Sequence, residues 1–136
     1  MKLTGIIAIS GKPGLYTVVK QSKNSVIVQN IETGRKMPAF ATDRISALED
    51  ISIYTMEGDE LLSVVFQSIF EKENGKEAIS HKANVAELQD YMRAVLADYD
   101  DERVQTSDIK KVFQWYNLLQ KGGILKLASE AVSEEE

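Results

Sequence analysis

The chain has no cysteine and a single histidine, His81. Without cysteine it can form no disulfide, no thiolate metal site and no thiol nucleophile. A lone histidine has no second imidazole for a metal site and no serine–carboxylate pattern around it, so we interpret His81 as a surface loop residue. We therefore predict no metal and no cofactor.

Long apolar runs are also missing. No uninterrupted run approaches the roughly 20 residues that a membrane-spanning helix needs. The apolar run at residues 6–9 is shorter than the roughly seven to fifteen residues of a signal peptide core, and it indicates a strand instead. With no cysteine and no targeting signal, we expect a cytoplasmic protein.

Nucleotide-binding motifs fail on spacing. Gly11-Lys12 follows Gly5 after five residues where a phosphate-binding loop has four, and Pro13 stands where that loop needs a hydroxyl. We interpret this segment as a hairpin turn.

What the sequence does contain is a change of pattern near Thr55. Residues 1–55 show short β-branched runs between Gly, Pro and Asn turns, and they carry seven Lys/Arg against four Asp/Glu. Residues 56–136 show apolar residues at helical spacing, with nine Lys/Arg against seventeen Asp/Glu. One part is mildly basic and the other strongly acidic.

The pattern of residues 1–55 predicts a small five-stranded SH3-like antiparallel barrel, with which an α+β fold begins. Because proline cannot donate to a ladder, the strand that contains Pro38 is expected to be an edge strand or a short one. The turn at residues 11–14 is expected to be type II. The expected strands are Gly5–Ser10, Leu15–Gln21, Asn24–Ile31, Arg35–Phe40 and Ala47–Ile53.

The remainder predicts a three-helix unit over residues 56–127 and a disordered acidic tail over residues 128–136. The first helix is expected from Gly58 to Glu73. Asn84 should cap the second, which ends near Asp98, and Ser107 should cap the third. On the third helix, a polar face directed to solvent is expected to hold Lys110, Gln114, Asn117 and Lys121.

Candidate binding residues are cations at the expected turns together with nearby aromatic side chains. Small barrels bind single-stranded nucleic acid or peptides through such mixtures, although turn lysines can also serve only to protect strand edges. Trp115 is either a core residue or an interface anchor. The candidates are Lys12, Lys20, Lys23, Arg35, Lys36, Tyr16, Lys111 and Trp115.

Four carboxylates at residues 98–102 raise a different possibility. Asp98, Asp100 and Glu102 alternate as the first ligands of a calcium loop do, but Arg103 stands where that loop needs glycine. They serve a hydrolase only if the fold brings them together and separates their pKa values. The residues are Asp98, Asp100, Asp101 and Glu102.

Three segments together resemble a family of uncharacterised small bacterial proteins. They are residues 11–16 (Gly-Lys-Pro-Gly-Leu-Tyr), residues 51–55 (Ile-Ser-Ile-Tyr-Thr) and residues 107–117 (Ser-Asp-Ile-Lys-Lys through Trp-Tyr-Asn). The resemblance implies a β-rich N-terminal domain and a helical C-terminal domain, and it implies no activity or catalytic residue.

The sequence therefore favours a non-enzymatic adaptor that binds a protein or nucleic-acid partner. Binding of RNA or single-stranded DNA by the basic barrel is the first alternative, and a carboxylate-dependent hydrolase is the second. We expect no membrane partner, and a homodimer remains open.

Overall fold

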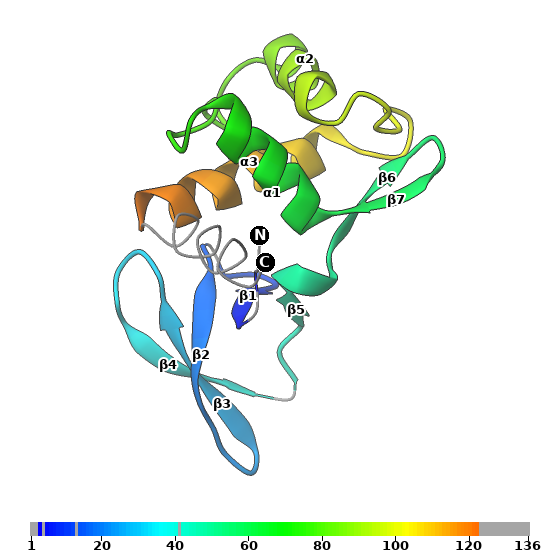
Figure 1. The fold of residues 1–136 in the computed structure, drawn as a ribbon. Helices are drawn as coiled ribbons and strands as arrows, with labels where there is room; N and C mark the ends of the chain where they lie inside the picture. The colour runs from blue at the N-terminus through cyan, green and yellow to red at the C-terminus, as the bar shows by residue number, and fades with distance from the viewer. Residues whose placement is uncertain (1–2, 4, 13, 41, 123–136) are drawn as a thin grey trace, which may run out of the picture.

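The computed structural model describes residues 3, 5–12, 14–40 and 42–122. It has an α+β fold in which a five-stranded sheet lies beside three helices, with a two-stranded hairpin between them in sequence (Figure 1). The predicted acidic tail lies outside the described residues. The strands are β1 (Ile6–Ile9), β2 (Tyr16–Gln21), β3 (Ser25–Asn30), β4 (Lys36–Phe40), β5 (Ile45–Ala47), β6 (Ser52–Thr55) and β7 (Gly58–Leu61).

The five-stranded sheet is antiparallel, in the order β4-β3-β2-β1-β5. The prediction that Pro38 marks an edge strand is confirmed, because β4 is the outermost strand on one side. No pairing between β4 and β5 is found among the described residues, so the sheet is open and the expected closed barrel is not observed. Gly14 has the positive φ, +85°, that the expected turn requires, while Pro13 lies outside the described residues.

The predicted fifth strand is wrong in its extent. Instead of one strand over Ala47–Ile53, β5 ends at Ala47, a 3-10 turn covers Leu48–Asp50, and β6 begins at Ser52. Leu48 is fully buried, so the chain turns there to place that side chain in the core. The strand after it leaves the sheet and pairs with β7 instead.

The β6–β7 hairpin also displaces the start of the first helix. The Thr55 hydroxyl donates to the Gly58 carbonyl at 3.1 Å and accepts from the Glu57 N–H at 3.3 Å, which closes a turn that the helical spacing did not indicate. Residues 58–61 therefore pair as a strand, and α1 covers Leu62–Lys72 rather than beginning at Gly58.

The two other helices are α2 (Val85–Val95) and α3 (Thr106–Lys121). The Asn84 cap is confirmed: its side chain accepts from the Glu87 N–H at 2.9 Å. The Ser107 cap is wrong, because α3 begins at Thr106 and its cap is Gln105, two residues before Ser107. The Asp108 carboxylate accepts from the Gln105 N–H at 3.1 Å. Among the described residues, no helix is long and apolar enough to cross a membrane.

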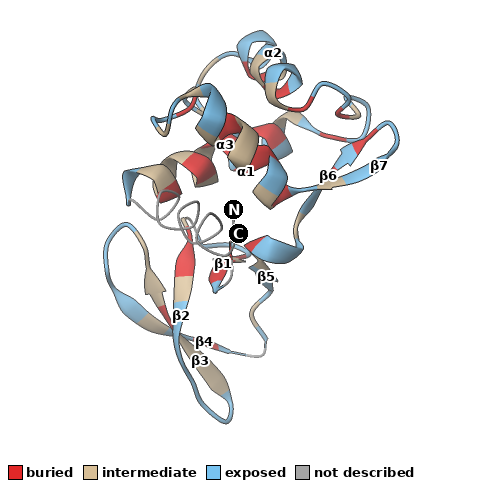
Figure 2. Cartoon of the chain, in the orientation of Figure 1, coloured by how far each residue is buried: buried red, intermediate tan, exposed pale blue. Residues whose placement is uncertain are grey.

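One large hydrophobic cluster joins the sheet to the helices. Ile6 of β1, together with Leu3 and Leu15 just before β1 and β2, belongs to the same cluster as Phe66 and Phe113 of the helices. Figure 2 shows the buried residues gathered on the facing sides of α1 and α3 and on β1. The opposite face of the sheet carries a smaller cluster: Ile7, Ile9, Tyr16, Val28 and Ala39.

The loop between α1 and α2 is held by polar side chains of α3. The Asn117 side chain accepts from the Ala78 N–H at 2.7 Å and donates to the carbonyls of Ala78 and Ile79, at 3.3 Å and 3.2 Å. The Tyr116 hydroxyl donates to the Lys76 carbonyl at 3.0 Å, and burial raises the pKa of this tyrosine to about 12. Asn117 is therefore half-buried under this loop and not on a solvent-facing surface.

Candidate binding groove

The predicted basic turn residues do not form one cluster. Lys20 and Lys23 lie at the β2–β3 turn, whereas Arg35 and Lys36 lie at the β3–β4 turn, and all four are exposed. These turns are at opposite ends of β3, a strand of six residues that spans about 20 Å. They present two separate cationic surfaces.

Tyr16 is not a surface residue. It is 5% exposed and belongs to the small cluster on the outer face of the sheet. Its ring is not available to stack on a ligand unless the sheet opens, so the aromatic part of the expected binding surface must come from elsewhere.

Lys12, Lys111 and Trp115 do come together, from the β1–β2 turn and from α3. Lys111 and Trp115 line two adjoining cavities at the junction of the sheet and the helices, and Lys12 lines one of the two. Ile51 is the third residue that both cavities share. We call the two cavities together the junction groove. The cavity beside β6 has a volume of about 240 Å³, and the cavity beside the β1–β2 turn about 370 Å³.

The cavity beside the β1–β2 turn is the cationic half of the groove. Its lining contains Lys12 and Lys111 and, among the described residues, no Asp or Glu. Gly11 has φ of +82°, so the backbone can turn at the end of β1, and the Lys12 N–H donates to the Ile9 carbonyl at 3.1 Å. Further hydrogen-bonding side chains in this half are Ser10, Ser46 and Gln114.

The cavity beside β6 is the apolar half. Its lining includes Ile53, Leu62 and Val112, which are all at least nine-tenths buried. Its one carboxylate, Asp108, accepts from the Gln105 N–H and so helps to cap α3. Trp115 is half-buried against the rim of the large cluster and borders both halves.

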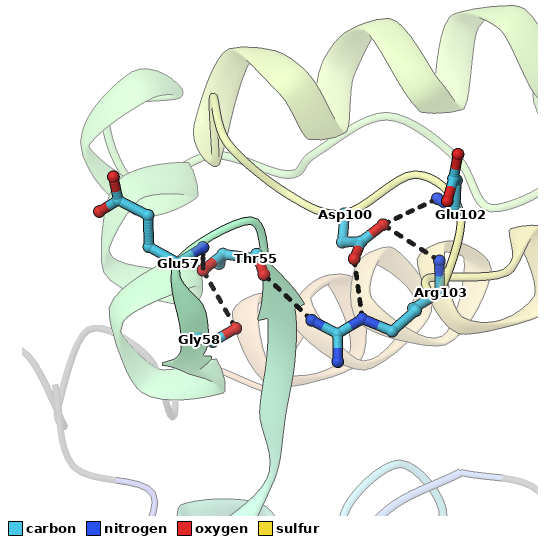
Figure 3. Close-up of polar contacts among 6 residues, drawn as sticks. All are labelled: Thr55, Glu57, Gly58, Asp100, Glu102 and Arg103. Atoms are coloured by element: carbon cyan, nitrogen blue, oxygen red, sulfur yellow. Dashed lines mark hydrogen bonds and ion pairs between the residues drawn. The ribbon is translucent and has the colours of Figure 1, made fainter.

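The Asp100 carboxylate has structural partners within its own loop (Figure 3). Asp100 accepts from the N–H groups of Glu102 and Arg103 at 3.0 Å and 3.3 Å, and from the Arg103 Nε at 2.7 Å. The Arg103 hydrogen bond is the main reason why the pKa of Asp100 is lowered from its usual value. Asp100 therefore shapes its own loop and holds Arg103.

Arg103 in turn ties this loop to the β6–β7 hairpin. It donates to the Thr55 carbonyl at 3.2 Å, and its guanidinium lies 4.5 Å from the centre of the Tyr54 ring. Backbone hydrogen bonds join the same segments: Met56 N–H to the Asp98 carbonyl and Asp100 N–H to the Tyr54 carbonyl, both at 2.9 Å. No local sequence signal indicates this contact, because Thr55 and Arg103 are 48 residues apart.

The other acidic residues of this loop are exposed. Asp101 lies 3.5 Å from Arg93 in an exposed ion pair, and Asp98 and Glu102 are also exposed. Within the described residues, no three His, Cys, Asp or Glu side chains are placed to hold a metal ion. His81 is half-exposed in the loop between α1 and α2.

Comparisons with known proteins divide at the same junction. Residues 51–119 match the family described as Domain of unknown function (DUF6852), and residues 3–48 match Domain of unknown function (DUF5606). A solution NMR structure of a structural genomics target from Bacteroides vulgatus has a TM-score of 0.74 and 42% sequence identity, over 90% of this chain and 89% of that chain. No curated protein matches the chain. The junction groove is lined from both matched segments.

Proposed function

From the geometry of the junction groove, we propose that this chain, which belongs to the family described as Domain of unknown function (DUF6852), is a non-enzymatic adaptor that binds a partner in that groove. We also propose that it acts in the cytoplasm, where proteins seldom depend on disulfides, because a chain without cysteine can form none.

One observation carries this proposal: Lys12 and the Lys111–Trp115 pair, far apart in the sequence, line the same groove. Ligand sites occur preferentially where two structural units meet, with apolar walls and a few polar groups that fix orientation. The junction groove has both features, since Lys12 comes from the sheet, Lys111 and Trp115 come from α3, and aliphatic side chains line one half.

Each of these residues has a distinct role in the proposal. The two exposed lysines attract an acidic partner and increase the association rate. Trp115 provides a large, partly buried ring that contacts the bound segment on both halves of the groove. Most of the affinity would therefore come from the tryptophan and the apolar half, and the charge would select the partner.

We also propose that the five-stranded sheet is an incompletely closed SH3-like barrel. Phe40 of the β4 edge and Ile45 of the β5 edge line the same hollow of about 370 Å³. The two edges of the sheet are therefore close to each other at this point. Small barrels of this type are frequent binding modules.

Affinity capture tests the adaptor function. The tagged full chain, a Lys12→Glu/Lys111→Glu double variant and a Lys110→Glu control are used to capture partners from native lysate, with and without nuclease. Lys110 is an exposed lysine on the same helix that does not line the groove. We expect a nuclease-resistant partner that the double variant loses and the control keeps; a set of captured proteins unchanged by the double variant contradicts the proposal.

Binding of single-stranded nucleic acid is a second candidate, because one hollow combines a lysine with an aromatic ring. Lys23 and the half-exposed Phe40 line it, and Lys20 is exposed nearby at the end of β2. Stacking on an aromatic ring beside cations is the usual basis of such binding. The test is retention of a labelled oligonucleotide across a salt titration: no retention even at low ionic strength excludes this candidate.

The hydrolase alternative has no supporting observation on the described residues. Asp100 uses its carboxylate for its own loop and for Arg103, and Asp101 faces Arg93 in solvent. A general acid and base need carboxylates that converge on one substrate.

A further inference from the structure

We propose that the partner presents an extended acidic peptide segment, with a carboxylate bound in the cationic half of the junction groove and a neighbouring apolar side chain bound in the apolar half. This inference rests on the proposed adaptor function and adds the chemistry of the segment that is recognised. It follows from the difference between the two halves and from their continuity through Ile51, Lys111 and Trp115.

The cationic half is unusual within this molecule. The chain has 21 Asp and Glu against 16 Lys and Arg, yet the described residues that line this half include two lysines and no carboxylate. An ammonium group donates up to three hydrogen bonds, and the hydroxyls of Ser10 and Ser46 can donate further ones. A carboxylate accepts only, so this half is complementary to an acidic side chain.

The apolar half selects the neighbouring residue. Ile51, Ile53 and Val104 contribute aliphatic surface to its walls, and Trp115 also lines it. A single leucine or phenylalanine side chain would bury its surface there, and burial of one such side chain is a major favourable contribution to binding. An acidic residue next to an apolar one satisfies both halves at once.

A nucleic-acid strand fits this groove less well than a peptide does. Strong binding of a polyanion needs several cations along its path, and the groove offers two, followed by Asp108 in the apolar half. Residues 56–136 carry a net charge of minus eight and would repel further phosphates. A peptide with one or two carboxylates avoids that repulsion.

Three labelled 12-residue peptides without aromatic residues test the assignment: one built on Glu and Leu, one with Gln in place of Glu, and one with Ser in place of Leu. Binding is followed by the fluorescence of Trp115, which is the only tryptophan of the chain. We expect the Glu/Leu peptide to bind about tenfold more tightly than either of the others. The Gln peptide lacks the carboxylate for the cationic half of the groove, and the Ser peptide lacks the apolar side chain for the apolar half.

The protein variants show where the peptide binds. Lys111→Glu should lower the affinity for the Glu/Leu peptide by about tenfold or more, and the Lys110→Glu control should leave that affinity unchanged. Equal losses in both variants overturn the assignment to the groove, because long-range charge alone would then explain the binding.

A fourth probe, an oligothymidylate, separates this inference from the adaptor function. If the oligonucleotide binds in a Lys111-dependent way and the Glu/Leu peptide does not, the peptide assignment is overturned and a groove-binding function remains. If neither probe binds and affinity capture is also unaffected by the lysine variants, both proposals fail.

Discussion

The helical region and the sheet region of this protein are stabilised in different ways. The helices enclose most of one large cluster, which includes the fully buried Phe66 and Phe113. Among the described residues, the outer face of the sheet carries a cluster of only five buried side chains, and nearby Phe40 and Ile45 are 50% and 40% exposed. Burial of apolar surface is the main stabilising contribution to a fold. We therefore expect the helical region to contribute most of the stability, and the sheet to depend on its packing against the helices.

The largest expected effect is that of Phe66→Ala. Phe66 is fully buried and packs edge-on against Tyr116, with ring centres 5.8 Å apart. Its truncation should reduce the free energy of unfolding by about 3–5 kcal/mol, measured by urea denaturation. The matched change Phe40→Ala, in the sheet, should cost less than about 1 kcal/mol. Equal costs would contradict the proposed difference between the two regions.

A smaller and more local effect is expected for Asn117→Ala, which leaves the backbone groups of Ala78 and the Ile79 carbonyl without this partner. The cost should be about 1–3 kcal/mol, with faster hydrogen exchange of the Ala78 amide. Asn117→Asp keeps the acceptor for that amide and removes the donor. The Ala78 amide should therefore stay protected in Asn117→Asp, and rapid exchange in that variant would contradict the assigned hydrogen bond.

The smallest effect concerns the contact between the acidic loop and the β6–β7 hairpin. Arg103 lowers the pKa of Asp100, so the carboxylate form stabilises the folded state. That contribution is present above the unfolded pKa near 3.8 and is lost as the pH falls through the lower folded value. In Arg103→Gln the Asp100 carboxyl carbon should titrate at higher pH by NMR; an unchanged titration would show that Arg103 is not the cause.

Local patterns predicted much of the fold. The turn residues between β-branched runs located β1 to β4, Pro38 identified an edge strand, and Asn84 identified the start of α2. The division of the predicted fifth strand was missed, because alternation at Ile51 and Ile53 does not tell whether a strand joins the sheet or pairs with the next segment. Helical spacing likewise showed which face of α3 carries Asn117, but not that a loop covers it.

The candidate site was predicted only in parts. The sequence identified Lys12, Lys111 and Trp115 as separate candidates, and it grouped Lys12 with turn residues that the structure places elsewhere. Which of these cations lies beside the tryptophan depends on how the sheet packs against the helices in the large cluster, which contains Leu3, Ile6 and Leu15. This docking is a property of the packed core, and no local pattern contains it.

The most direct test of the account is an amide and indole NMR titration of the full chain with the Glu/Leu peptide. We predict that the Trp115 indole signal and the amides of Ser10, Lys12 and Lys111 shift together at one affinity, because one groove contacts both regions. Shifts confined to the β2–β3 and β3–β4 turns, or no shifts at all, would contradict the claim that the junction of the two regions is the binding site.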